Sequence, residues 1–181
     1  MISDTLHTDK SAAMTTLLQA IAESYPSQTP IGPSSSSSTP NKTETETYTP
    51  HPIDLPHTSR LYKTLLQGGH FNHTTKTIEP SPSWDAGEFA VRFVGIVGAG
   101  GDEGDGEQIK AMCCKGERNG TFLVAELCAA LIKEENSDTN VSVHEARQKL
   151  KSWLCTSPVR KEIEEGEAKG KKVLLENIGK L

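Results

Sequence analysis

Two heptapeptides near the C-terminal end of the chain, GTFLVAE at residues 120–126 and GKKVLLE at residues 170–176, share one pattern. Each begins with glycine, continues with two side chains and an apolar pair, and reaches a glutamate at its seventh position. A third phrase, TSRLYKTLL at residues 58–66, has the same shape with threonine in place of glycine. Self-similarity of this kind predicts stacked helical repeats, which bury each helix against its neighbours and leave one long face free for a partner. The sequence therefore predicts an all-α fold and a binding function.

Composition divides the chain into three parts. Residues 1–25 contain a predicted helix at 11–25; an isolated helix of this length is marginal in water, so it either docks on the later body or packs against sequence outside this chain. Residues 26–56 hold a run of serines and alternating threonine and glutamate. They predict a disordered linker, because they have almost nothing to bury. Residues 57–181 hold most of the apolar stripes and predict a helical repeat domain.

Turn and cap signals give the expected elements of this domain. A helix at 61–67 ends at two glycines, a natural C-cap, and residues 70–83 are expected to form a loop. Residues 86–97 predict either a strand or a helix, because their apolar alternation is imperfect. The most apolar helix, at 119–135, is expected at the centre of the core. A loop rich in glycine and acidic residues is predicted at 98–106. Helices are predicted at 107–115, 142–155 and 168–180, and a further helix is predicted to begin at Ser157-Pro158. A capping box at Ser142 marks the start of the helix at 142–155.

The sequence shows neither a secretory signal nor a membrane span. Residues 1–10 are polar and slightly acidic, without a basic region followed by an apolar core. The longest apolar run, residues 89–99, contains Arg92 and is far shorter than the ~20 residues that a membrane helix needs. The sequence predicts a soluble, intracellular protein without a membrane partner.

No set of residues predicts catalysis, a metal site or a small-molecule cofactor. The four cysteines lack the paired spacing of a zinc site, and we interpret them as buried, reduced thiols. Residues 95–104 resemble a dinucleotide-binding turn, but Glu103 stands where the third glycine belongs and Asp102 would repel a pyrophosphate. The acidic residues lack the spacing of an EF-hand calcium loop, and the histidines form no catalytic set. We therefore expect a protein that is not an enzyme.

The repeated phrases resemble the RNA-facing helices of Pumilio repeats, and their order resembles the C-terminal CPL region of the nucleolar Puf-A/Penguin-type Pumilio proteins. The phrases that carry the resemblance are LYKTLLQGGHF at 61–71, RNG at 118–120 before its apolar helix, and GKKVLLENI at 170–178. The resemblance covers about residue 14 to the end, with the linker as an insertion. It implies armadillo-like stacked repeats, RNA binding in ribosome biogenesis (pre-rRNA processing) or translational control, and a nuclear and nucleolar location. It also implies that the chain is a fragment of a protein with many repeats.

Pumilio repeats read a base with the first, second and fifth side chains of the helix after the glycine. In the second and third phrases the fifth positions are Ala125 and Leu175, which cannot hydrogen-bond a base edge. The resemblance therefore implies sequence-tolerant contact with the RNA backbone, in which cationic side chains meet phosphates. The implied partners are pre-rRNA or mRNA and ribosome-assembly proteins. The RNA-binding residues that the resemblance implies are Arg60, Lys63, Arg118, Asn119, Phe122, Lys171 and Lys172.

The charge balance leaves two binding functions open. The chain has a formal net charge of −5, whereas nucleic-acid binders are usually basic. From Val141 to the end, however, basic residues exceed acidic ones. A basic free face would indicate RNA, and an apolar or mixed face would indicate a protein-interaction or solenoid-capping module without RNA contact. Phe122 would be plain core if buried, and would fit a base or a partner's pocket if exposed.

Overall fold

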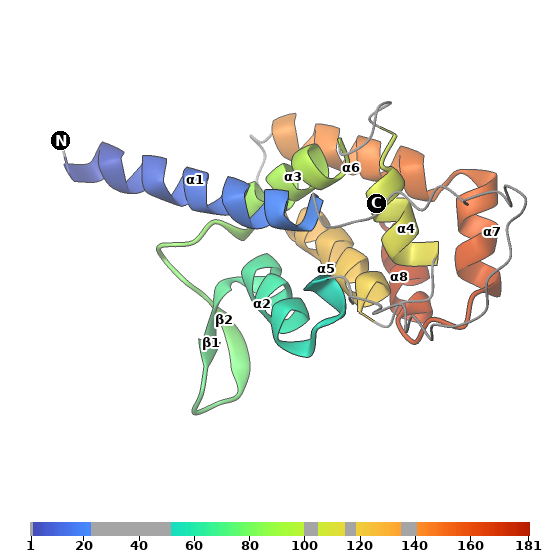
Figure 1. The fold of residues 1–181 in the computed structure, drawn as a ribbon, viewed down its shortest axis with the longest axis horizontal. Coiled ribbons are helices and arrows are strands. Elements are labelled where there is room, and N and C mark those ends of the chain that lie inside the picture. The colour runs from blue at the N-terminus through green and yellow to red at the C-terminus, as the bar shows by residue number, and fades with distance from the viewer. Residues whose placement is uncertain (1, 23–51, 100–104, 115–118, 135–140) are drawn as a thin grey trace, which may run out of the picture.

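The computed structural model of the protein describes residues 2–22, 52–99, 105–114, 119–134 and 141–181. This part of the chain is predominantly helical, as predicted, and contains one two-stranded antiparallel sheet (Figure 1). The elements are α1 (Ile2–Ala22), the 3-10 turn η1 (Pro52–Asp54), α2 (Pro56–Gln67), β1 (Gly69–Asn72), β2 (Thr77–Pro80), α3 (Ala86–Val97), α4 (Glu107–Cys114), α5 (Gly120–Lys133), α6 (Val141–Leu154), α7 (Ser157–Glu165) and α8 (Lys171–Ile178).

α5 is the central helix. It contacts α2, α3, α4, α6 and α8, and its residues Leu123, Leu127 and Leu131 are buried. Buried side chains occupy more than one side of this helix, as expected of a helix that is enclosed by neighbours. The prediction that segment 119–135 forms the centre of the core is confirmed.

The helices form two layers (Figure 1). α2, α5 and α8 lie side by side in one layer, because α5 contacts both of the others. α1, α3 and α6 form the second layer, in which α3 contacts both α1 and α6. α3 and α6 also contact α5, while α4 and α7 close one end of the molecule. The three helices that carry the repeated phrases are thus neighbours, in the order in which they occur in the chain.

α1 docks on the rest of the protein, which is the first of the two alternatives that the sequence left open for this helix. Met14, Leu18 and Ile21 are buried in the common core, and α1 packs along α3. The Tyr62 hydroxyl of α2 donates a hydrogen bond of 2.6 Å to the carbonyl oxygen of Leu17. The helix starts at Ile2, well before the predicted start at residue 11, and its N-terminal half extends beyond the body (Figure 1).

Segment 86–97, which the sequence assigned to a strand or a helix, is the helix α3. The carboxylate of Asp85 accepts a 2.8 Å hydrogen bond from the backbone N–H of Glu88, which caps the first turn. Phe89, Phe93 and Val97 recur every four residues and are all buried. The helical period therefore determines this segment, despite its strand-like content of valine and isoleucine.

The prediction of a loop at 70–83 is wrong, because this segment contains the β1–β2 hairpin. Phe71 pairs with Ile78, and His70 pairs with Glu79. The Asn72 side chain stabilises the turn by accepting a 2.9 Å hydrogen bond from the backbone N–H of Thr74. Strands of only four residues contain too few side chains to show a clear alternation, so sequence periodicity missed them.

Three boundaries differ from the sequence predictions. Most of the predicted linker lies outside the described residues, but its last part already belongs to the folded body, where η1 buries Ile53. Ser142 lies inside α6, which starts at Val141, so it is not the N-cap residue. The cap of α7 is Thr156, one residue before the predicted Ser157. These shifts leave the order of the helices unchanged.

Candidate nucleic-acid interface

The outer surface of the layer formed by α2, α5 and α8 carries one continuous stripe of side chains from each helix. The residues of each stripe recur every three or four positions and so point to the same side of their helix. Five of them are cationic and two are carboxylates, although the chain as a whole is acidic. This surface, called the α2–α5–α8 face, consists of Arg60, Lys63, Thr64 and Gln67 from α2, Phe122, Glu126, Ala129 and Lys133 from α5, Lys172, Val173 and Glu176 from α8, and Lys180 just after the end of α8.

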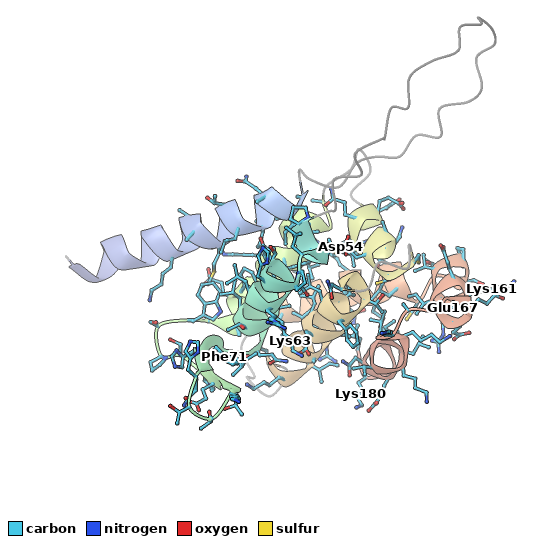
Figure 2. All side chains as sticks on the ribbon, turned by 60° about the horizontal axis from the view of Figure 1, so that its bottom comes forward. Asp54, Lys63, Phe71, Lys161, Glu167 and Lys180 are labelled. Atoms are coloured by element: carbon cyan, nitrogen blue, oxygen red, sulfur yellow. The ribbon has the colours of Figure 1, made fainter. Side chains whose placement is uncertain are left out.

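An ion pair joins the stripes of α2 and α5. Lys63 Nζ lies 3.0 Å from Glu126 Oε1, and the other carboxylate oxygen of Glu126 accepts a hydrogen bond from Gln67 Nε2. The Lys63 side chain is about half exposed (48%), whereas that of Glu126 is 23% exposed. Figure 2 shows Lys63 where these two helices meet. Lys63 is thus held at the surface of the layer and remains accessible to a partner.

Phe122 lies where α5 meets α8 and is 41% exposed. Its ring rests on Gly170, where an added Cβ atom would lie only 3.1 Å from ring atom Cδ1. Asn177 of α8 also donates a 2.9 Å hydrogen bond to the carbonyl oxygen of Ala125, so the stripes of α5 and α8 are adjacent. The ring is therefore neither core nor free-standing: one side is supported and the other faces solvent.

The glycines of the repeated phrase have a packing role. An added Cβ atom at Gly120 would lie 2.6 Å from the carbonyl oxygen of Met112 in α4. At Gly170 it would press on the Phe122 ring, as described above. At Gly120 the first turn of the helix therefore touches a preceding element too closely for any larger residue, whereas at Gly170 a larger residue would require Phe122 to shift by a few tenths of an ångström.

The structure separates the predicted RNA-binding residues into two groups. Arg60, Lys63, Phe122 and Lys172 lie exposed on the α2–α5–α8 face. Asn119 and Lys171 serve the fold instead. Asn119 Nδ2 donates a 3.0 Å hydrogen bond to the carbonyl oxygen of Asp54, and Lys171 Nζ donates hydrogen bonds of 3.0 and 2.7 Å to the carbonyl oxygens of Glu164 and Gly166 at the end of α7. Arg118 lies outside the described residues.

Two of the three positions that would read a base in the middle phrase are inside the protein. Thr121, the first position, and Ala125, the fifth, are both buried, so only Phe122, the second, reaches the surface. Arg60 and Lys63 lie on the neighbouring helix α2, and Lys172 lies on the neighbouring helix α8. Sequence reasoning named these residues but missed Lys133, Lys180 and Glu126, which follow from the helical period once the exposed stripe is known.

Two of the four cysteines are buried, one is partly buried and one is exposed. Cys113 and Cys128 are buried, and burial raises the pKa of Cys128 to about 12. Cys114 borders a pocket of about 370 Å³ between α4 and α7. Burial, followed by the nearby Glu162 carboxylate, raises the pKa of Cys114 to about 12, so this group remains a thiol rather than a nucleophilic thiolate. Cys155 is exposed, contrary to the prediction of four buried thiols. Among the described residues, no group of three or more His, Cys, Asp or Glu could hold a metal ion.

Two glycines after α3, Gly98 and Gly106, pack against a tryptophan, whereas residues 100–104 of the predicted glycine-acid loop lie outside the described residues. Gly98 and Gly106 are joined by a 3.1 Å hydrogen bond from the N–H of Gly106 to the carbonyl oxygen of Gly98. An added Cβ atom would lie 2.4 Å from the Trp153 indole at Gly98 and 2.3 Å from it at Gly106. Gly106 also has φ +69°, which favours glycine. These two glycines therefore admit an indole from α6.

Within the described part of the chain, no helix is long and apolar enough to cross a membrane. Comparison of the sequence and structure with known proteins finds no matching family model, no matching curated protein and no matching solved structure.

Proposed function

We propose that this protein binds RNA through the α2–α5–α8 face, by sequence-tolerant contact with the phosphate backbone. The observation that carries the proposal is the juxtaposition of an exposed aromatic ring with cations on both sides of it. Phe122 stands in the middle helix, Arg60 and Lys63 lie on one neighbour, and Lys172 lies on the other. Aromatic rings that stack on bases, surrounded by cations that follow the backbone, are typical of proteins that bind single-stranded nucleic acid.

Sequence tolerance follows from the side chains that are present and absent. Arg60, Lys63 and Lys172 meet phosphates as charges, and phosphates carry no sequence information. Phe122 stacks on any base, because every base has a π-face. Since Thr121 and Ala125 are buried, the middle helix offers no polar side chain to a base edge from these positions. Discrimination between sequences is therefore expected to be weak.

The cellular setting of this binding belongs to the same proposal and rests on the resemblance to Puf-A/Penguin-type Pumilio proteins. It comprises ribosome biogenesis or translational control, stacked repeats of the Pumilio type, and a nucleolar location. A fluorescent fusion of the chain that stays outside the nucleus would count against this setting without affecting the binding chemistry.

A second candidate function is docking of a protein on the same layer. Leu61 of α2 and Val173 of α8 are large apolar side chains that are 45% and 49% exposed, respectively. Apolar side chains of this kind contribute to protein interfaces. RNA is favoured because the five cations of the α2–α5–α8 face outnumber its two carboxylates. Each carboxylate is paired with one of these cations, Glu126 with Lys63 at 3.0 Å and Glu176 with Lys180 at 2.7 Å, so the face keeps a net charge of +3.

The test is fluorescence anisotropy of the full chain with unrelated single-stranded RNAs across a salt series. The variant Arg60→Ala/Lys63→Ala/Lys172→Ala should weaken binding of all sequences alike. It should also reduce the slope of log K against log salt by about 2, because each lost phosphate contact removes roughly 0.7 from the slope for single strands.

The matched control removes the same charge elsewhere. Lys149, Lys151 and Lys161 are exposed on α6 and α7, so Lys149→Ala/Lys151→Ala/Lys161→Ala should leave the salt slope close to wild type. Equal losses in both triple variants would show that only total charge matters. Absence of binding at low salt by a chain with a cooperative unfolding transition would overturn RNA binding and favour protein docking.

A further inference from the structure

The first turn of α7 has the sequence SPVR, at residues 157–160. Proline-directed protein kinases phosphorylate a serine or threonine that proline follows directly, because proline has no backbone N–H that would be left unpaired in the kinase. Several of these kinases also prefer a cation three residues after the hydroxyl, the position that Arg160 holds here. The start of α7 therefore has the residue pattern that this class of kinase recognises.

This segment lies at the surface, at one end of the molecule. Residues 155–158 and 160–161 are all exposed. Figure 2 shows Lys161 at the outer end of the protein, on the side opposite to Phe71. Ser157 and the cation after Pro158 are thus both accessible to a second protein.

The Ser157 hydroxyl is free to react. It makes no hydrogen bond within the described part of the chain. The hydroxyl of the neighbouring Thr156, in contrast, donates a 2.9 Å hydrogen bond to the carbonyl oxygen of Trp153. Ser157 therefore offers an acceptor for a phosphoryl group that the fold does not already use.

The backbone around Ser157 opens at little cost. Thr156 is already extended, with φ −60° and ψ 136°. A residue that precedes a proline disfavours the helical conformation, so Ser157 gains little from its place in the helix. Val159 is the one buried side chain among residues 155–161. A kinase can therefore bind this segment in an extended form by opening the first turn of α7.

One other serine of the described residues precedes a proline, and it lacks the rest of the pattern. Ser81 is followed by Pro82, but Trp84 stands three residues later instead of a cation. The Ser81 hydroxyl also lies 3.0 Å from the Ser83 hydroxyl, as a hydrogen-bond partner. Ser81 therefore serves as an internal control.

From these observations we infer that Ser157 is a phosphorylation site for a proline-directed protein kinase. Ser157 Oγ attacks the γ-phosphorus of ATP, the new P–O bond forms as the bond to the ADP oxygen breaks, and the hydroxyl proton passes to a base of the kinase. The phosphate then lies at the start of α7, where no side chain caps the first turn. Negative charge at a helix N-terminus is stabilising, so the modification should fix this turn. The inference does not depend on RNA binding.

The experiment incubates the full chain with a cyclin-dependent kinase, its cyclin and Mg·ATP, and measures phosphate at each site by tandem mass spectrometry. Sites are quantified separately because residues 39–42, TPNK, have the same pattern. Ser157 should be phosphorylated, and Pro158→Ala should lower the rate about tenfold, because it adds an unpaired N–H. Arg160→Ala should also lower the rate. Lys149→Ala, which removes a cation from α6, should leave it unchanged.

A peptide of residues 152–166 separates recognition of the pattern from access in the folded chain. Phosphorylation of the peptide but not of the chain at Ser157 would overturn the site, because the first turn of α7 would not open. No phosphorylation of either would overturn recognition, and equal phosphorylation of Ser81 and Ser157 would overturn the selection by pattern.

Thermal unfolding tests the effect of the phosphate. In a Thr39→Ala background, the phosphorylated chain should unfold about 1–4 °C higher than the same sample after phosphatase treatment. An unchanged or lower Tm would overturn the stabilisation of α7.

Discussion

Replacing Glu126 by glutamine should strengthen RNA binding, although it changes no residue that we expect to touch RNA. The Glu126 carboxylate lies 3.0 Å from the Lys63 ammonium and competes with a phosphate for it. Glutamine keeps the shape of the side chain and an oxygen that can accept the hydrogen bond from Gln67. The substitution therefore removes the competing charge and keeps most of the contact between α2 and α5.

The size of the effect follows from the exposure of the pair. Lys63 is 48% exposed and Glu126 is 23% exposed, so solvent screens their attraction. Ion pairs of this kind contribute about 0.2–1 kcal/mol. In the wild type a phosphate that binds Lys63 must break this ion pair, whereas in the variant the pair is absent and this free energy is not lost. The expected gain in RNA affinity is therefore roughly 1.4- to fivefold. The slope of log K against log salt should steepen by at most about 0.7, the contribution of one more phosphate on a single strand.

The assay is fluorescence anisotropy with oligouridine across a salt series, and the control is Glu164→Gln. Glu164 lies 3.0 Å from Arg160 in α7, so this variant also removes one carboxylate from an ion pair, but away from the α2–α5–α8 face. It should change neither affinity nor slope. Weaker binding by Glu126→Gln would refute the competition between carboxylate and phosphate. An equal gain in both variants would assign the effect to net charge.

Three further predictions concern stability and thiol chemistry. Tyr62→Phe removes the hydrogen bond from α2 to α1 and should lower the free energy of unfolding in urea by about 0.5–1.5 kcal/mol, and no change would show that this bond is not stabilising. Gly95→Ala should raise the free energy of unfolding by roughly 0.5–1 kcal/mol, because Gly95 lies in a helix and an added Cβ atom there meets open space. Gly98→Ala should lower the free energy of unfolding, because an added Cβ atom there overlaps the Trp153 indole. A change of the same sign in both variants would contradict this packing. Burial raises the pKa of Cys128 from 9.0 to about 12, so its contribution to stability is complete below pH 9 and is lost as the pH rises toward 12. Cys128→Ala should therefore flatten the decline of stability with alkaline pH, and iodoacetamide mapped by mass spectrometry should modify exposed Cys155 before Cys128.

The helices could be predicted because their signals lie within one or two turns of sequence. The spacing of apolar residues alone predicts α2, α5 and α8, and Gly68 and Gly69 alone predict the C-cap of α2. For α3 the apolar composition was ambiguous, but a local signal was present: Asp85 and Glu88 mark the start of a helix three residues apart. This cap is specific to a helix and distinguishes it from a strand at this segment.

The individual contacts of the site could not be predicted, because they join residues that are distant in the chain. Lys171 looked like a free cation in its phrase, yet it binds carbonyl groups at the end of α7. Asn119 looked like part of an RNA-facing phrase, yet its amide binds Asp54, 65 residues earlier. The hairpin depends on Trp84 packing against Gly69, a contact that no periodicity reveals. Local patterns specify which helices form, whereas long-range packing decides which side chains remain available.

The same distinction explains why a net charge of −5 does not argue against RNA. The acidic excess lies outside this face, which has five cations and two carboxylates; α7, for example, has three exposed glutamates against Arg160 and Lys161. Charges are screened over about 8 Å at physiological salt, so a phosphate at the α2–α5–α8 face responds to the cations within that distance rather than to the total charge of the chain. Net charge governs long-range encounter, and local charge governs contact. An acidic chain with a basic face is therefore expected to associate with RNA more slowly than a basic one, without losing the contacts that hold it there.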